Sequence, residues 1–200
     1  YQEKFSLKKI YIYGLSNIEK QNIEIELNKL KNINIFKLNE DRVLKTLKKF
    51  NFLESIYVNK VIPSTININL SKTLIIGKTL RNREYFYIGK NGNFIKPDQL
   101  NETINLPSVF GDFTIEEYID LQNLLSENGV DVQNVEKYFY YKNRRWDLLF
   151  SNKLTLMLPA KKVEESIKVY KKLLDNKNLI NIKIIDLRVS NQIILTNNNE

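Results

Sequence analysis

The sequence predicts an α+β protein: an N-terminal module with the order β-α-α-β-β, followed by a mostly antiparallel β-domain with two helices. Within residues 1–72, segments that alternate polar and apolar side chains flank two segments with helical spacing. Beyond residue 72, short strand patterns and turn signals dominate, and two amphipathic helices interrupt them. Elements grouped in this way are typical of sheets that helices cover on one face.

The clearest element is a β-hairpin over residues 53–70. Residues 65–70 alternate strictly, so that Ile66, Ile68 and Leu70 share one face of a strand. Residues 53–61 are rich in β-branched and aromatic side chains, and Pro63 stiffens the turn between the two runs. Because a lone hairpin is only marginally stable in water, the preceding segment is expected to cover its apolar face.

That preceding segment predicts one strand and two helices. Residues 7–13 alternate as a strand, and Ser16 with Glu19 has the spacing of a capping box at a helix start. Asn39 is the predicted N-cap of a second helix. The apolar stripes of the two helices are formed by Ile23, Leu27 and Leu30, and by Val43, Leu44 and Leu47. We therefore expect two helices on one face of a three-stranded sheet.

The remaining chain predicts a second sheet. Strands are expected over residues 74–80, 84–88, 94–95, 132–141, 145–150, 154–159, 182–189 and 192–196. Apolar spacing predicts helices from Ile115 to near Gly129 and from Val163 to Leu174. An Asn-Gly pair at 91–92 indicates a tight turn between two of the strands.

The composition leaves little room for catalysis. The chain has no cysteine and no histidine, which excludes thiol nucleophiles, disulfides, the usual zinc sites and histidine-based triads. Asp112, Glu116 and Glu117 cluster at a predicted helix start, where capping and the helix dipole explain them better than acid–base chemistry. We therefore expect a protein that is not an enzyme and needs no cofactor.

The net charge of +8 comes mostly from lysines spread along the chain, and we interpret it as compositional drift rather than a polyanion site. The strongest case for nucleic-acid stacking is Tyr138–Tyr141 with Arg144, Arg145 and Trp146. The favoured alternative is a pair of adjacent strands whose aromatic rings line the core. In a third interpretation, Arg144 and Arg145 flank a partner-binding surface. No nucleic-acid partner is expected; such a partner would make affinity fall steeply with salt.

The last predicted strand lies within residues 189–196, which contain neither proline nor lysine. A chain-terminal strand at a sheet edge exposes unpaired backbone groups, which invite aggregation unless they are blocked or used. Proteins that bind by strand addition use such an edge. The alternatives are an edge covered by its own domain and a buried strand.

Several motifs occur in an order that resembles the FtsQ/DivIB family of bacterial cell-division proteins. They are Ile10–Gly14, Ile35–Leu38, Phe52–Lys60, Ile62–Ile68, Tyr87–Phe94, Leu106–Gly111, Arg145–Pro159 and Ile185–Arg188. Phe52, Lys153 and Val189 replace the Trp, Gly and Tyr that the family pattern has at these positions. The family's Glu, Pro and Ala after the hairpin are also missing.

This resemblance implies a POTRA domain over residues 1–72 and a β-domain over residues 73–200. It further implies a divisome scaffold in the bacterial inner membrane and periplasm, held by an N-terminal anchor that precedes Tyr1 and is absent from this chain. The β-domain would bind an FtsB/FtsL-like partner by strand addition, and the POTRA domain other divisome membrane proteins. The implied contact residues are Arg188, Val189, Asn191, Ile193 and Leu195, with Arg144. A POTRA-type chaperone module of an outer-membrane assembly or secretion protein is the alternative.

Overall fold

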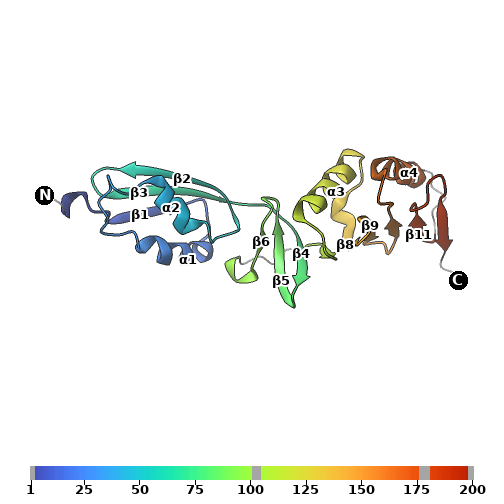
Figure 1. Cartoon of the computed structure of the whole chain (residues 1–200), viewed down its shortest axis with the longest axis horizontal. Coiled ribbons are helices and arrows are strands. Elements are labelled where there is room, and N and C mark those ends of the chain that lie inside the picture. The colour runs from blue at the N-terminus through green and yellow to red at the C-terminus, as the bar shows by residue number, and fades with distance from the viewer. Residues whose placement is uncertain (1–2, 101–104, 176–180, 198–200) are drawn as a thin grey trace. The chain divides into compact units, whose positions relative to one another are not determined.

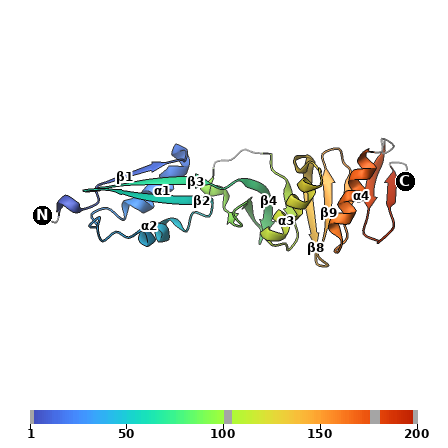
Figure 2. The same ribbon diagram turned by 90° about the horizontal axis from the view of Figure 1, so that it is seen from above.

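The computed structural model describes residues 3–100, 105–175 and 181–197. The chain forms two compact units (Figures 1 and 2). The first comprises Tyr1–Ile75 and Gly89–Ile104, and the second comprises Ile76–Ile88 and Asn105–Glu200.

The first unit contains a three-stranded sheet and two helices, in the predicted order. Its main elements are β1 (Lys9–Tyr13), α1 (Asn17–Asn28), α2 (Glu40–Leu47), β2 (Leu53–Val61) and β3 (Thr65–Lys72), preceded by the short helix η1 (Glu3–Phe5). The strand order is β1-β3-β2, with β1 parallel and β2 antiparallel to the central strand. The predicted β-α-α-β-β module is confirmed.

Burial explains why this unit folds as the sequence predicts. Ile66 and Ile68 are fully buried on one face of β3, together with Ile23 and Leu27 of α1 and Leu47 of α2. Each residue buried in this way gains about 1.5–3 kcal/mol relative to an exposed position. The apolar stripes therefore hold the helices against the hairpin.

Local caps fix where the two helices begin. The amide of Glu19 donates to Oγ of Ser16 over 3.4 Å, and the amide of Ser16 donates to Oε2 of Glu19 over 2.9 Å. The side chain of Asn39 accepts from the amide of Arg42 over 3.1 Å. Both predicted N-caps are confirmed, and each satisfies amides that a helix start leaves without intrahelical partners.

The second sheet has the order β12-β11-β10-β9-β8-β7-β4-β5-β6. Its strands are β4 (Ile75–Arg81), β5 (Glu84–Gly89), β6 (Phe94–Ile95), β7 (Ser108–Phe110), β8 (Val135–Tyr141), β9 (Arg145–Phe150), β10 (Thr155–Met157), β11 (Ile182–Asp186) and β12 (Ile194–Asn197). The helices along this part of the chain are η2 (Pro97–Gln99), α3 (Ile115–Glu127), η3 (Val132–Asn134) and α4 (Val163–Asp175).

Connections between strands set their directions. The pairs β8–β9, β9–β10 and β11–β12 follow short connections and are antiparallel. The pairs β7–β8 and β10–β11 are parallel, because α3 and α4 cross over between their strands. The pair β4–β7 is also parallel. The predicted α+β class is confirmed. The parallel pairs occur where the connection between the two strands is long.

One face of this sheet forms the core of the second unit. Residues in register across five strands are fully buried on that face: Val109, Tyr138, Leu148, Leu156 and Ile185. Tyr118 of α3 and Ile167 of α4 are fully buried as well. Helices α3 and α4 therefore cover this face of the sheet, and residues one position away along each strand point to the other face.

The strands differ from the sequence prediction at several places. The strand predicted over 132–141 begins only at Val135, after a short 3₁₀ helix, and β7 was not predicted at all. The strand predicted over 182–189 ends at Asp186, and the last strand covers Ile194–Asn197 rather than 192–196. The reason for the last two shifts is a turn between Asp186 and Ile194, in which Asn191 has a left-handed φ of 63°.

Candidate functional site

The strand β12 lies at one edge of the second sheet. It pairs antiparallel with β11, with Asp186 opposite Ile194 and Ile185 opposite Leu195. Within residues 3–100, 105–175 and 181–197, no other strand adjoins β12. Because alternate residues of a strand direct their N–H and C=O groups to opposite sides, half of these groups on β12 face away from β11. The edge position that the sequence predicts is therefore present.

The side chains at this edge are apolar and exposed. Ile193, Ile194 and Leu195 are 47%, 48% and 42% exposed, and Val189 is 50% exposed. Leu195 lies on the helix-covered face, in register with Ile185, whereas Ile194 lies on the opposite face, in register with Asp186. The edge thus offers apolar surface on both sides of the sheet, next to main-chain groups that can extend it.

A groove of about 250 Å³ lies between α4 and the turn that precedes β12. On one side it is lined by Lys161, Lys162, Glu165, Ser166 and Val169, and on the other by residues 187 and 189–193. Three of the predicted contact residues, Val189, Asn191 and Ile193, therefore meet at one surface.

Val189, Asn191, Ile193 and Leu195 do not share one strand, although the sequence prediction placed the final edge strand within residues 189–196. Val189 and Asn191 belong to the turn, Ile193 directly precedes β12, and only Leu195 lies within it. The turn is stabilised by the amide of Gln192, which donates to the carbonyl oxygen of Val189 over 3.2 Å. The strand prediction for 189–193 was wrong because this local hydrogen bonding replaces sheet pairing.

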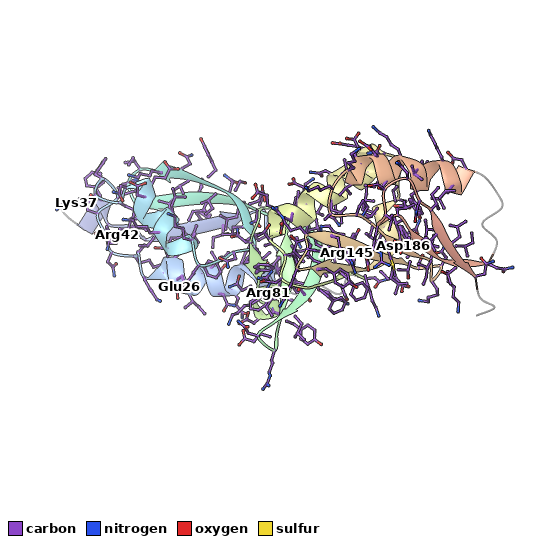
Figure 3. All side chains as sticks on the ribbon, turned by 45° about the vertical axis from the view of Figure 1, so that its right-hand side comes forward. Glu26, Lys37, Arg42, Arg81, Arg145 and Asp186 are labelled. Atoms are coloured by element: carbon purple, nitrogen blue, oxygen red, sulfur yellow. The ribbon has the colours of Figure 1, made fainter. Side chains whose placement is uncertain are left out.

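The guanidinium of Arg188 pairs with a carboxylate of the same chain. Its Nε donates to Oδ1 of Asp186 over 2.8 Å, and its Nη2 donates to Oδ2 over 2.6 Å. This paired hydrogen bond from Arg188 holds the pKa of Asp186 below its usual value. Asp186 lies on the face of the sheet that α3 and α4 leave open, as does Arg145 (Figure 3).

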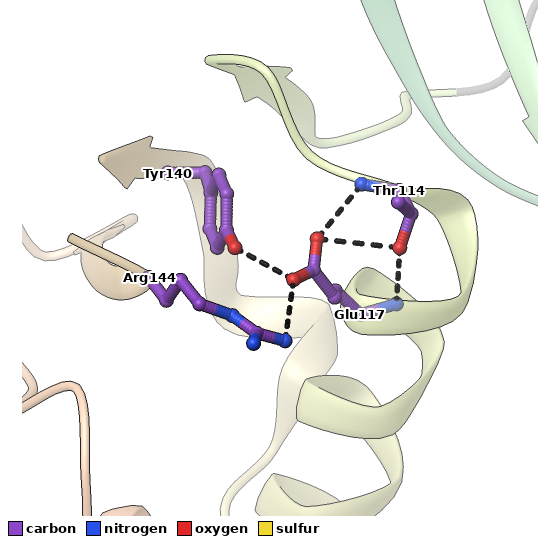
Figure 4. A network of polar contacts seen from close by, with 4 residues as sticks. All are labelled: Thr114, Glu117, Tyr140 and Arg144. Atoms are coloured by element: carbon purple, nitrogen blue, oxygen red, sulfur yellow. Dashed lines mark hydrogen bonds and ion pairs between the residues drawn. The ribbon is translucent and has the colours of Figure 1, made fainter. Parts of the chain in front are cut away.

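Arg144 lies elsewhere, in the turn between β8 and β9. Its Nη2 donates to Oε1 of Glu117 over 3.2 Å, and the hydroxyl of Tyr140 donates to the same oxygen over 2.6 Å (Figure 4). Partial burial acts to raise the pKa of Glu117, but hydrogen bonds from Tyr140, Thr114 and Arg144 bring it below its usual value. All of these residues except Thr114 line a second groove of about 480 Å³.

The two grooves are adjacent without sharing the predicted residues. Lys161, in the connection between β10 and α4, lines both of them. Arg144 lines the second groove only, and Val189 lines the first. The predicted contact residues are thus divided between neighbouring surfaces on the second unit.

Two family models cover most of the chain. The model described as "Cell division protein FtsQ/DivIB, C-terminal" matches residues 79–188, more than half of the 200 residues. The model described as "POTRA domain, FtsQ-type" matches residues 5–72. The chain belongs to the FtsQ/DivIB family of cell-division proteins.

Individual FtsQ proteins are similar over nearly the whole chain. FtsQ from Rickettsia bellii is 30% identical over 191 residues, which cover 94% of this chain and 71% of that protein. FtsQ from Rickettsia conorii is 26% identical over 197 residues, with the same coverage of both chains. Among solved structures, the major extracytoplasmic domain of DivIB from Geobacillus stearothermophilus aligns with a TM-score of 0.36 and 13% identity, covering 54% of this chain and 98% of that one.

The aromatic and basic stretch of this FtsQ/DivIB chain is built into its fold. Tyr138 is fully buried and Trp146 is 6% exposed, and their ring centroids lie 6.4 Å apart. Arg145 lies over the ring of Tyr141, 4.2 Å from its centroid, and Arg144 pairs with Glu117. These contacts favour the interpretation that the aromatic rings line a core, rather than the stacking platform considered as the alternative.

Other features bear on catalysis and anchoring. Among the described residues, no group of three or more acidic, histidine or cysteine side chains could hold a metal ion. In the same part of this FtsQ/DivIB chain, no helix is both long and apolar enough to cross a membrane.

The sequence did not reveal two groups of residues at this site. Glu165, Ser166 and Val169 form the α4 wall of the first groove, and their pattern only indicated the exposed side of a helix. Asp147 and Asp186 are buried although both are acidic, at 4% and 8% exposure. A usable signal existed for the second group, because Asp147 lies between the apolar residues Trp146 and Leu148, and Asp186 lies between Ile185 and Leu187 in the FtsQ/DivIB chain.

Proposed function

We propose that this chain is the extracytoplasmic part of a non-enzymatic division scaffold, which holds an FtsB/FtsL-like partner by strand addition along β12. The family assignment supports a role in cell division. The observation that carries the mechanism is the edge position of β12, together with its exposed apolar side chains. Main-chain hydrogen bonds would supply affinity, and alternate side chains would supply selectivity.

The contacts of such a partner follow from the geometry of the edge. A strand laid along β12 would direct alternate side chains toward Leu195 on the α4 side and toward Ile194 on the open face. Beyond the strand, the partner segment would continue past Ile193 into the groove that Val189 and Asn191 line. Arg188 and Arg144 would lie at the margins of this interface.

The remaining parts of the proposal follow the family. The POTRA domain over residues 1–72 would contact other divisome membrane proteins, and the β-domain over residues 73–200 would carry the edge. The chain would follow a membrane anchor in the bacterial inner membrane and lie in the periplasm. The proposal needs no cofactor and no nucleic acid.

A proline series along the edge tests this mechanism. Proline removes a backbone donor, so single substitutions at Ile193, Ile194, Leu195 and Thr196 probe successive amides. Where the amide faces away from β11, we expect affinity for the FtsB-like partner to fall at least about tenfold, while the thermal midpoint of unfolding is unchanged. Where the amide pairs with β11, the midpoint should fall as well.

Alanine at the same four positions is the matched control, because it shortens the side chain and keeps the donor. We expect each alanine variant to bind more tightly than a proline variant whose missing donor faces the partner. Binding that survives every proline substitution undiminished would exclude strand addition at β12.

A further inference from the structure

We propose that Asp186 and Arg188 act as a positioning pair: together they set the turn that carries residues 189–193 and hold β12 ready for a partner strand. Arg188 would thus influence binding through Asp186 rather than by touching the partner. This inference rests on the proposed function and identifies residues that control the same edge.

Three hydrogen bonds join Arg188 to the carboxylate of Asp186. Besides its two guanidinium contacts to the Asp186 carboxylate, Arg188 donates its own backbone N–H to Oδ1 of Asp186 over 3.0 Å. A carboxylate that accepts from the backbone two residues further on forms an Asx turn, which bends the chain away from an extended path. Both carboxylate oxygens and the fork of the guanidinium are engaged in this way.

The bend coincides with the end of β11. The amide of Leu187 makes a last sheet-like bond, to the carbonyl oxygen of Met157 over 2.9 Å, and the chain then leaves the sheet. Asp186 is also the residue opposite Ile194, with which β12 begins. A single side chain therefore lies where the chain leaves β11 and where it returns as β12.

Asp186 and Arg188 are part of a larger group of charged side chains. Asp147 and Asp186 lie in one row across the sheet, separated by Met157 of β10. Arg145 approaches Asp147, with 3.8 Å between Nε and Oδ1. Two arginines and two aspartates thus gather on the open face of the sheet, with each arginine beside one aspartate. The side chain of Asp186 is only 10% exposed, so its charge depends on Arg188 for compensation.

This arrangement bears on affinity through pre-organisation. A partner strand that meets an already ordered edge does not have to order the turn as it binds. If the pair were broken, residues 187–193 would be free to adopt other conformations, and β12 would lose its fixed return along β11. The affinity for the partner would then fall, although no direct contact with the partner would be lost.

Two measurements on the whole 200-residue chain test the proposal, with the variants Asp186→Asn, Arg188→Gln, Arg188→Lys and the Asn/Gln double variant. The first is hydrogen exchange of amides 194–197 in the free protein, with the amides of β8 as the internal reference. The second is binding of the fluorescently labelled extracytoplasmic segment of the FtsB-like protein encoded in the same genome.

We expect Asp186→Asn and Arg188→Gln to speed exchange in β12 and to weaken binding by about tenfold each. The double variant should bind no more weakly than either single one, because both remove the same pair. Arg188→Lys should fall between these variants and the wild type, since lysine cannot make the paired contact.

Two results would overturn the proposal. One is weak binding by Arg188→Gln while Asp186→Asn binds as the wild type does, which would make Arg188 a direct contact. The other is unchanged exchange in β12 for both single variants. If the wild-type chain did not bind the segment at all, the proposed function would fail, and the exchange measurement would still decide whether the pair positions β12.

Discussion

Tyr140 donates its hydroxyl hydrogen to Oε1 of Glu117 over 2.6 Å and thereby ties β8 to the first turn of α3 (Figure 4). The same carboxylate accepts from the amide of Thr114 over 3.0 Å, which completes the capping box of the helix. Glu117 thus combines a local role, which the sequence predicted, with a tertiary one. Both roles need the ionised carboxylate, because it accepts hydrogen bonds from all of its partners.

Glu117→Gln should lower the free energy of unfolding by about 1–2 kcal/mol at neutral pH, because it weakens both the cap and the link to Tyr140. The pKa of Glu117 is lowered in the folded state. Its stabilisation is therefore complete above the unfolded-state pKa and is lost as the pH falls through the folded-state pKa. Urea titrations over that range should show the difference between variant and wild type shrinking in acid. Glu116→Gln, at an exposed position of the same turn, should change stability by only a few tenths of a kcal/mol.

Gly14 and Gly92 form a matched pair for testing backbone strain. Both have a left-handed φ, 88° and 82°, but a Cβ at Gly14 would lie 1.9 Å from the carbonyl oxygen of Leu70, whereas a Cβ at Gly92 meets nothing within 4 Å. Gly92→Ala should cost about 1–2 kcal/mol of stability. Gly14→Ala should cost about 3 kcal/mol or more, because the end of β3 must also move. Equal losses in thermal unfolding would contradict this account of Gly14.

Lys153 occupies a left-handed position, with a φ of 68°, where the family pattern has glycine. Lys153→Gly should therefore raise the free energy of unfolding by about 0.5–1 kcal/mol. The relief of backbone strain in the folded state should outweigh the larger conformational entropy that glycine gives to the unfolded chain. The substitution also removes an ion pair, in which Nζ of Lys153 lies 3.0 Å from Oε2 of Glu136. Because both side chains are exposed, this pair contributes less than about 0.5 kcal/mol. Lys153→Ala removes the same ion pair but keeps the strain, so it should be slightly less stable than the wild type.

Asp147 is a buried acid whose environment disfavours its charge. Burial raises its pKa, and the nearby Arg145 only partly opposes this shift. A raised folded-state pKa means that this group lowers stability increasingly as the pH rises from the unfolded-state value through the folded-state value. Asp147→Asn should therefore be more stable than the wild type at neutral pH, and the two should converge in acid. A wild type that is the more stable protein at pH 7 would show that the charge of Asp147 is fully compensated.

Much of the fold could be predicted because its signals are local. The hairpin around Pro63 is indicated by strict alternation, and the caps at Ser16 and Asn39 involve residues only a few positions apart. The hairpin and both caps are present in the structure. The position of the last strand at a sheet edge was also predicted from its place at the end of the chain. In contrast, β7 has only three residues, which is too short for a period to be recognised.

The unpredicted parts depend on contacts between distant residues. Glu117 lies 23 residues from Tyr140 and 27 from Arg144, and no local pattern indicates that they meet. The end of β11 was misplaced for a different reason. Asp186 and Arg188 fit an extended strand as well as a turn, and only the paired hydrogen bond between them decides for the turn.

The most direct test of strand addition is hydrogen exchange at individual amides of β12, with and without the FtsB-like partner segment. Binding along this edge should slow exchange at those amides of residues 193–197 that face away from β11, while amides already paired with β11 change little. Protection that appears at every second residue is the expected result. If the segment binds and exchange within β12 stays as it is in the free protein, the partner does not extend the sheet and the proposed mechanism is wrong.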